Sequence, residues 1–155
     1  MEKFFGFPPL FDANSKVLVL GSFPSVKSRA EGFYYGNKQN RFWKTLCQAF
    51  DVPLVVTVEE KKQLCLNNGI ALWDIVDSCQ IKGSMDADIA NYRLVDLSEV
   101  LGRAKIVKIL CNGQKAYELT TAVYNGDVPV YKMPSTSPAN VRFDKDLWLS
   151  QLKGE

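Results

Sequence analysis

Four short, mainly apolar runs recur along the chain, at residues 16–21, 69–73, 106–111 and 128–133. Runs with apolar residues at successive positions, rather than at alternating ones, are typical of strands covered on both faces, as in a parallel sheet. Each of the last three runs is preceded by a segment that can supply a crossover connection. The pattern therefore predicts a small, mostly parallel sheet of four strands.

Helices are predicted between these strands from their apolar spacing and boundary signals. Thr57 and Glu60 have the spacing of a capping box, residues 67–69 (Asn-Asn-Gly) read as a helix stop, and Asp144 falls in a first helical turn. No repeat or linker interrupts the alternation, so we expect one domain over residues 1–155, an α/β three-layer α/β/α sandwich. The predicted helices cover residues 41–50, 57–68, 97–101, 113–124 and 143–153.

The charge of the chain is small overall but uneven. The 155 residues carry a net charge of +2, whereas positions 22–44 hold five basic residues and one acidic residue, a net charge of +4. Such a segment suits phosphate contacts, although an ordinary solvated surface would have the same composition. The first residues have no features of a signal peptide, and no apolar run is long enough for a membrane span, so we expect a cytoplasmic protein.

Several classes of chemistry are excluded by what the sequence lacks. Histidine is absent, which removes the Ser-His-Asp triad and imidazole metal ligands. The four cysteines form no CxxC pair, so neither a zinc nor an iron-sulfur site is indicated. The glycine spacings that cradle a pyrophosphate are missing as well. We expect no metal and no cofactor.

Polar segments follow each predicted strand, at residues 21–25, 73–77, 111–115 and 133–140. Because ligands of such sheets bind beyond the carboxyl ends of the strands, these segments are predicted to meet at one cleft. The last of them contains hydroxyl side chains and two prolines, which suits a loop that approaches nucleic acid closely; a rigid connector is the alternative.

The segment 33–43 combines five aromatic residues with two asparagines and two cations. Aromatic rings interleaved with cations suit a base that is stacked while its phosphates are neutralised. Phe42 and Trp43 also fit the core face of the following helix, whereas Tyr34 and Tyr35 precede a glycine-containing turn and are less easily explained as core.

Five motifs in this order, GSFPS, FYYGNKQNRFW, GIALWDIVDSCQIKGSMDADI, CNGQKAY and PSTSPAN, resemble the hypoxanthine-DNA glycosylase family of the uracil-DNA glycosylase superfamily. The resemblance spans nearly the whole chain. It implies the fold of that superfamily and a monofunctional enzyme that acts without a metal on DNA containing deaminated bases. Such an enzyme flips hypoxanthine, uracil or xanthine out of the helix and hydrolyses its N-glycosidic bond. We expect a monomer.

The resemblance also assigns roles to residues. It implies that the Tyr35 ring stacks on the flipped base, that the loop 134–140 enters the minor groove, and that residues 21–25 form the first catalytic motif. The base-binding candidates are Gly21, Ser22, Phe23, Tyr35 and Asn112. The DNA-binding candidates are Lys27, Arg29, Lys38, Arg41, Ser135, Thr136, Ser137 and Asn140.

The chain departs from the wider superfamily at two catalytic positions. Phe23 stands where other members usually have Asp or Asn, and Ser135 stands where the uracil enzymes have His. With no carboxylate at the first position, we expect the amides of Asn40 and, second, Asn37 to be catalytic. An amide can orient water or pair with the base, although it is too weak a base to deprotonate water. The alternative is that Asn40 only caps the following helix.

Other functions stay open at this point. A mismatch-type uracil-DNA glycosylase would share most of these features. A non-catalytic nucleic-acid-binding module would explain the basic aromatic segment but not the polar strand ends. A flavodoxin-like domain for a small molecule would explain the cleft but not the cations.

Overall fold

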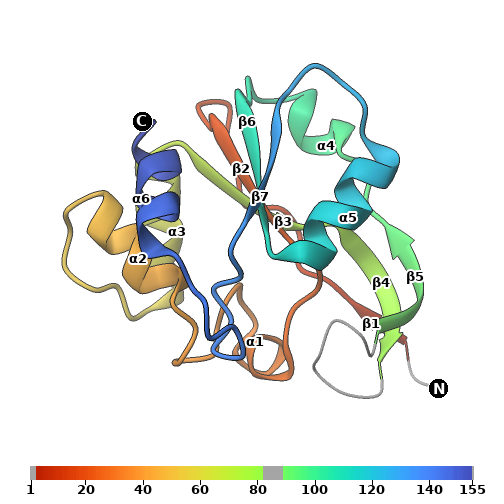
Figure 1. Cartoon of the computed structure of the whole chain (residues 1–155), viewed down its shortest axis with the longest axis horizontal. Helices are drawn as coiled ribbons and strands as arrows, with labels where there is room; N and C mark the ends of the chain where they lie inside the picture. Colours follow the sequence, from red (N-terminus) through yellow and green to blue (C-terminus); the bar gives the residue numbers. More distant parts are fainter. Residues whose placement is uncertain (1–2, 82–88, 155) are drawn as a thin grey trace.

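A parallel sheet lies at the centre of the structure, a computed structural model that describes residues 3–81 and 89–154 (Figure 1). Its strand order is β3-β2-β6-β7 and all neighbouring pairs are parallel. The four predicted strands are therefore confirmed, with bounds that differ slightly from the apolar runs. They are β2 (Val17–Gly21), β3 (Ile70–Asp74), β6 (Lys108–Asn112) and β7 (Val130–Met133).

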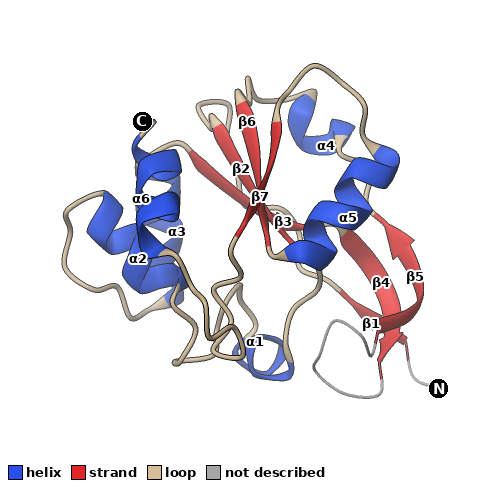
Figure 2. Cartoon of the chain, viewed as in Figure 1, coloured by secondary structure: helices blue, strands red, loops and turns tan. Residues whose placement is uncertain are grey.

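Helices cover both faces of this sheet (Figure 2), which confirms the three-layer α/β/α arrangement. α2 (Phe42–Ala49), α3 (Val58–Asn67) and α6 (Lys145–Lys153) lie on one side. α4 (Ser98–Leu101) and α5 (Gln114–Val123) lie on the other. The predicted capping box at Thr57 is present at the start of α3.

The alternation of side chains along the strands divides the core in two. In β2, Val19 belongs to the cluster beneath α2, α3 and α6, whereas Leu18 and Leu20 belong to the cluster beneath α4 and α5. All three residues are fully buried. Burial on both faces explains why β2 reads as a continuous apolar run instead of an alternating one.

A second sheet, which the apolar pattern did not predict, lies beside the first. It is antiparallel, with the order β1-β4-β5, and consists of β1 (Lys3–Phe5), β4 (Val76–Ile81) and β5 (Ile89–Leu94). One residue, Ile75, separates β4 from β3, so a single stretch of chain contributes to both sheets. The part of the third family motif at residues 82–88 lies outside the described residues.

A short helix, α1 (Val26–Glu31), was also not predicted. Ser25 caps it, since the Ser28 amide donates to Ser25 Oγ over 3.1 Å, and Gly32 ends it with φ at 80°. Serine before a helix and glycine after it are ordinary boundary signals, so the sequence did contain the marks of this turn. Short as it is, α1 places Ser25 and Ser28 beside the carboxyl end of β2.

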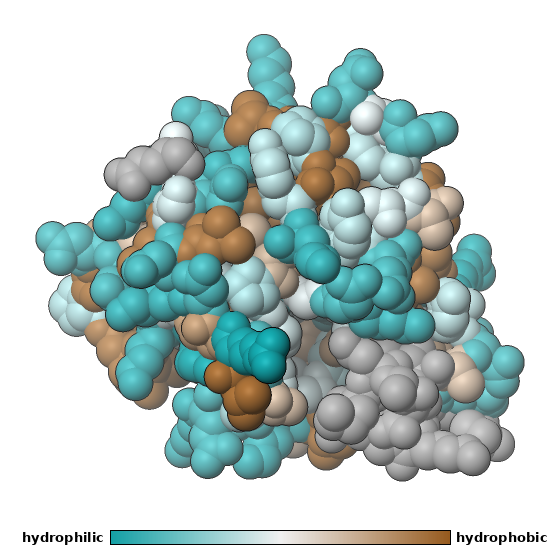
Figure 3. Space-filling model, in the orientation of Figure 1, coloured by the Kyte–Doolittle hydropathy of each residue, from teal (hydrophilic) through white to brown (hydrophobic). Residues whose placement is uncertain are grey.

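The surface seen in Figure 3 is mostly hydrophilic, with apolar residues in small separate groups. Scattered apolar groups of this kind are normal on a protein surface and mark no docking site. In the described part of the chain, no helix is long and apolar enough to cross a membrane.

Trp148 in α6 connects the core to the loop that follows β7. Its indole is fully buried, packs edge-on against Phe42 with 6.1 Å between ring centroids, and donates from Nε1 to the Pro134 carbonyl over 2.7 Å. One side chain thus holds together α2, α6 and the start of the loop.

We expect Trp148→Phe to lower the free energy of unfolding by about 1–3 kcal/mol, because it removes a donor from the Pro134 carbonyl and leaves a smaller ring in the core. Urea denaturation measures the change. The matched control is Leu147→Ala in the same helix, where the side chain is 39% exposed and the effect should stay within about 0.5 kcal/mol. Equal stability of the two variants would contradict the anchoring role of the indole.

Candidate active site

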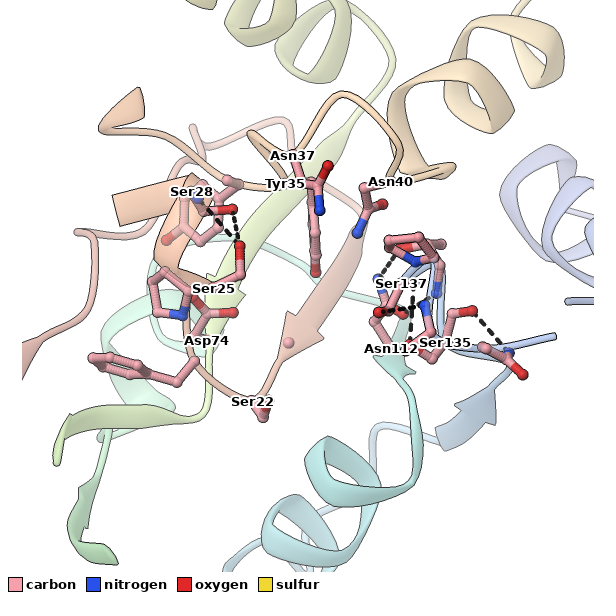
Figure 4. A pocket seen from close by; sticks show the side chains of 18 residues that line it. Ser22, Ser25, Ser28, Tyr35, Asn37, Asn40, Asp74, Asn112, Ser135 and Ser137 are labelled. Carbon is pink, nitrogen blue, oxygen red and sulfur yellow. Dashed lines mark hydrogen bonds between the residues drawn. The ribbon is translucent and has the colours of Figure 1, made fainter. Parts of the chain in front are cut away.

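A cavity of about 540 Å³ lies beyond the carboxyl ends of β2, β3 and β6 (Figure 4). Segments far apart in the sequence reach it, including all four of the polar segments that follow the central strands. The lining residues are Gly21, Ser22, Phe23, Pro24, Ser25, Ser28, Tyr34, Tyr35, Asn37, Asn40, Asp74, Asn112, Ser135, Thr136, Ser137, Pro138, Ala139 and Asn140.

Gly21 and Asp74 end neighbouring strands and pair directly in the parallel register. A Cβ atom on Gly21 would lie 2.3 Å from Asp74 Oδ1 and 3.0 Å from the Tyr35 hydroxyl. Real Cβ atoms essentially never approach other atoms so closely, so only glycine fits at position 21 while the carboxylate keeps its place. The Asp74 side chain is 4% exposed and lines the cavity.

Asp74 is the functional candidate that reasoning from the sequence missed. The segment 73–77 was identified as a polar strand end, but no site role was given to its carboxylates. The signal available was the position of Asp74, immediately after the last apolar residue of a buried strand. Phe23 leaves the first motif without a carboxylate, but the Asp74 carboxylate reaches the same cavity from the neighbouring strand.

Tyr35 is held firmly in the wall of the cavity. Its φ of 52° lies in the left-handed region that tyrosine rarely adopts, and its ring packs against Phe42 with 4.4 Å between centroids. Burial, and after it the charge of Asp74, raises the pKa of the Tyr35 hydroxyl above its usual value, so the phenol is protonated at neutral pH.

The side-chain amide of Asn112 lies near the Tyr35 hydroxyl and lowers its pKa, against the effects of burial and of Asp74. No hydrogen bond of normal geometry joins this buried hydroxyl to any residue that the structure describes. A buried hydroxyl without such a bond is costly to the fold, and a ligand in the cavity could satisfy it. Stacking of the Tyr35 ring on a base stays a prediction, since the contact with Phe42 gives the ring a structural role as well.

The oxygen and the nitrogen of the Asn40 side-chain amide face different surroundings. Its Oδ1 accepts a hydrogen bond from the backbone amide of Phe42, the first residue of α2, over 2.9 Å. The side chain therefore stabilises the start of the helix. Figure 4 shows its nitrogen turned toward the cavity. Asn40 thus contacts the start of the helix from the residue before its N-cap, Arg41, and this contact uses the oxygen and not the Nδ2 donor. Asn37, whose carbonyl accepts from the Asn40 amide over 2.8 Å, lines the cavity beside it.

The loop 134–140 is fastened to the sheet through Asn112. The Asn112 amide nitrogen donates to Thr136 Oγ1 over 2.9 Å, and the Thr136 amide donates back to Asn112 Oδ1 over 3.0 Å. The Thr136 side chain that takes part in this pair of hydrogen bonds is buried, with 1% of its surface exposed. The pair fixes the position of the loop relative to the end of β6.

Arg41 fastens the same loop from the other side. Its guanidinium donates to the Ser137 carbonyl and, over 2.7 Å, to the Asn140 carbonyl, and it lies over the Phe143 ring at 4.4 Å. Contact of Arg41 with a phosphate stays a prediction. Its guanidinium N–H groups already donate hydrogen bonds within the protein. Asn140 is likewise engaged at both ends, donating to the Ser135 carbonyl and accepting from the Arg142 amide.

The remaining DNA-binding candidates differ in how exposed they are and in whether they already contact other groups of the protein. Lys27 and Lys38 are exposed and line a shallow groove that shares Asn37 with the cavity. Arg29 is less free, since its guanidinium lies 4.5 Å from the centre of the Phe4 ring. Ser135 and Ser137 each accept a hydrogen bond from a backbone amide within the loop and also line the cavity.

Among the residues that the structure describes, no three or more His, Cys, Asp or Glu side chains gather in a group that could hold a metal ion. The polar groups of the cavity are amides, hydroxyls and one carboxylate. Such a set can bind a heterocyclic base by hydrogen bonds and can orient a water molecule.

Comparison with known proteins identifies relatives over nearly the whole chain. The chain is 35% identical over 143 residues to a hypoxanthine DNA glycosylase of Methanosarcina acetivorans, covering 91% of this chain and 90% of the relative. It is 31% identical over 115 residues to a hypoxanthine DNA glycosylase of Methanosarcina barkeri, covering 73% of each.

The fold has a counterpart among solved structures as well. A solution NMR structure of a Methanosarcina acetivorans protein, described as a uracil DNA glycosylase, superimposes with a TM-score of 0.87 at 30% sequence identity. The match covers 99% of this chain and 98% of that protein. The family model of the uracil DNA glycosylase superfamily matches residues 8–152. The chain belongs to the uracil DNA glycosylase superfamily.

Proposed function

We propose that this chain, as one domain over residues 1–155, is a monofunctional DNA glycosylase that removes hypoxanthine from DNA and leaves an abasic site. We propose further that it acts as a monomer, in the cytoplasm and without a cofactor. The observation that carries the proposal is the polar cavity at the carboxyl edge of the sheet, in a chain whose relatives are named hypoxanthine DNA glycosylases. Uracil and xanthine are the other candidate bases.

Capture of the base comes first in this mechanism. The target nucleotide leaves the stack, at a cost of a few kcal/mol that is smallest for a mismatched base, and its base enters the cavity. Tyr35 contacts the base from the wall, and Gly21, Ser22 and Phe23 form the floor at the end of β2. Asn112 acts mainly by holding the loop 134–140 in place, which follows from its two hydrogen bonds to Thr136.

Asn40 is the main catalytic side chain in this mechanism. As the glycosidic bond breaks, negative charge develops on the departing base, and an oriented N–H donor stabilises that charge. The hydrogen bond from the Phe42 amide to Asn40 Oδ1 fixes the amide so that Nδ2 faces the cavity. Asn37, second in importance, supports Asn40 and can hold the attacking water by proximity.

Phosphate contacts fall to the exposed cations. Lys27 and Lys38 extend from the groove next to the cavity, where the backbone on either side of a flipped nucleotide would pass. Arg29 and Arg41 contribute less to phosphate binding, because each already interacts with groups of the protein.

The proposal is tested with oligonucleotides that contain a single hypoxanthine, uracil or xanthine, treated with alkali after incubation to cleave abasic sites. We expect cleavage at hypoxanthine, unchanged by EDTA. Because one similar structure is described as a uracil DNA glycosylase, uracil is measured in parallel. Cleavage at uracil alone would favour the mismatch-type enzyme, and binding without cleavage would favour a non-catalytic module.

We expect Asn40→Asp to stay folded and to lower turnover by a factor on the order of 10² or more, about 2.7 kcal/mol. Aspartate still accepts from the Phe42 amide, but it has no N–H to offer the base. Single-turnover excision of hypoxanthine measures the loss. Asn40→Ala should in addition lose about 1 kcal/mol of stability, because it removes the hydrogen bond from the Phe42 amide.

The matched control is Thr57→Ala, which removes the cap of α3. It should lose a similar amount of stability and keep full activity. Unchanged turnover in Asn40→Asp, together with a destabilised Asn40→Ala, would reduce Asn40 to a helix cap.

Neutralising Lys27 and Lys38 together by glutamine should weaken DNA binding and lower the slope of log K against log salt by roughly 0.9 per lysine. Fluorescence anisotropy at several salt concentrations gives both quantities. The control is the double variant Lys16→Gln, Lys105→Gln, since these exposed lysines precede β2 and β6 at the opposite edge of the sheet. Equal slopes in the two double variants would remove Lys27 and Lys38 from the DNA interface.

A further inference from the structure

Deamination changes one ring nitrogen of a base in a way that a protein can detect. In adenine and cytosine this nitrogen is a hydrogen-bond acceptor, whereas in hypoxanthine and uracil the same position carries N–H and is a donor. An acceptor in the protein at this point pairs with the deaminated base and meets a second acceptor in the parent base. The difference in binding free energy between the two bases is large in a buried site, because a polar group that lacks its hydrogen-bond partner there cannot bond to water instead.

Asp74 provides such an acceptor in the cavity. An ionised carboxylate offers only acceptor sites, on two oxygens, and it pairs strongly with N–H donors. Its side chain is 4% exposed and lines the cavity from the end of β3 (Figure 4). The other side chains that line the cavity include no lysine or arginine among the described residues. Among the described residues that line the cavity, Asp74 alone carries a carboxyl group.

The surroundings of Asp74 are arranged around its carboxylate. Gly21 has no side chain, which leaves the space that Oδ1 approaches. The charge of Asp74 is also felt by the buried phenols of Tyr34 and Tyr35, whose pKa values are raised first by burial and then by this carboxylate. Both tyrosines line the cavity, so the charge acts on the space that a base would occupy.

We propose that Asp74 determines specificity by accepting a hydrogen bond from the ring N–H of the deaminated base and by repelling the ring nitrogen of adenine and cytosine. This inference rests on the proposed glycosylase function and assigns to Asp74 a role separate from that of Asn40. Asn40 offers a donor to the departing base, whereas Asp74 offers an acceptor that selects it. Guanine and thymine carry the same ring N–H, so this contact does not reject them.

The first test compares hypoxanthine with 1-methylhypoxanthine, which lacks the ring N–H, in otherwise identical single-stranded oligonucleotides. In the unaltered protein we expect the methyl group to lower kcat/KM by about 100-fold or more. In Asp74→Ala, excision of hypoxanthine should fall by about tenfold or more, and the ratio between the two substrates should shrink to within about threefold. The alanine variant has both lost the acceptor and gained room for the methyl group.

Asp77→Asn is the matched control, since it removes an exposed carboxylate three positions further along the chain. It should keep the ratio of the unaltered protein. If another part of the cavity wall excludes the methyl group, the ratio of kcat/KM between the two substrates will be the same in Asp74→Ala as in the unaltered protein. That result overturns the proposal. Equal excision of both bases by the unaltered protein overturns it as well. Failure of the unaltered protein to excise either base would instead refute the proposed function.

A second variant serves if Asp74→Ala does not fold, as judged by circular dichroism. Asp74→Asn has nearly the same shape and adds an N–H donor, which can pair with a ring nitrogen acceptor. The probe is an oligonucleotide with 2-aminopurine, a base whose N1 is an acceptor and whose fluorescence rises when it leaves the stack. At saturating protein we expect a rise with Asp74→Asn and little with the unaltered protein or Asp77→Asn. Equal signals from the three proteins would overturn the proposal.

Discussion

Parallel pairing of β2 with both β3 and β6 is the constraint on which the rest of the structure depends. Because the three strands run in the same direction, their last residues, Gly21, Asp74 and Asn112, reach one edge of the sheet. An antiparallel arrangement would carry Asp74 to the opposite edge. The cavity, the close approach at Gly21 and the joint between Asn112 and the loop 134–140 all follow from this register.

Three consecutive residues connect the stability of α2 with the chemistry of the cavity. Asn40 accepts from the first amide of the helix and directs its nitrogen inward, Arg41 holds the loop 134–140, and Phe42 packs against Tyr35 and Trp148. A side chain that serves the fold through one atom and the site through another is positioned without extra cost. Rigid placement of this kind is what an amide needs in order to act on a developing charge.

The sequence predicted the central sheet and the flanking helices well, because the apolar runs of β2, β3 and β6 are long enough to be distinctive. It did not predict β1, β4 and β5. These strands are short, and β4 begins one residue after β3, inside the segment 73–77 that was interpreted only as a polar strand end. Pairing across the second sheet depends on tertiary contacts that local patterning does not contain.

The candidate site was predictable as a region but less so as individual roles. Asp74 ends β3 and Asp77 lies in β4, in the second sheet; the two side chains have the same chemistry, so their burial distinguishes them and composition cannot. Arg41 looked like a phosphate ligand because its charge is visible in the sequence, whereas the carbonyls it binds belong to residues nearly a hundred positions away. The roles given to Asn40, Asn37 and Tyr35 stay predictions.

The order in which the chain contributes to the cavity has a consequence for folding. Tyr35 and Asn40 come early in the sequence, but the joint at Thr136 and the indole of Trp148 come close to its end. Distant segments must lose much chain entropy before they gain contacts, so such pairings form late. A ribosome-bound chain still lacking its last segments therefore has the inward-facing amide but not the wall opposite it. The cavity closes only when synthesis is nearly complete, and partly made chains present an open sheet edge at β6 until β7 pairs with it.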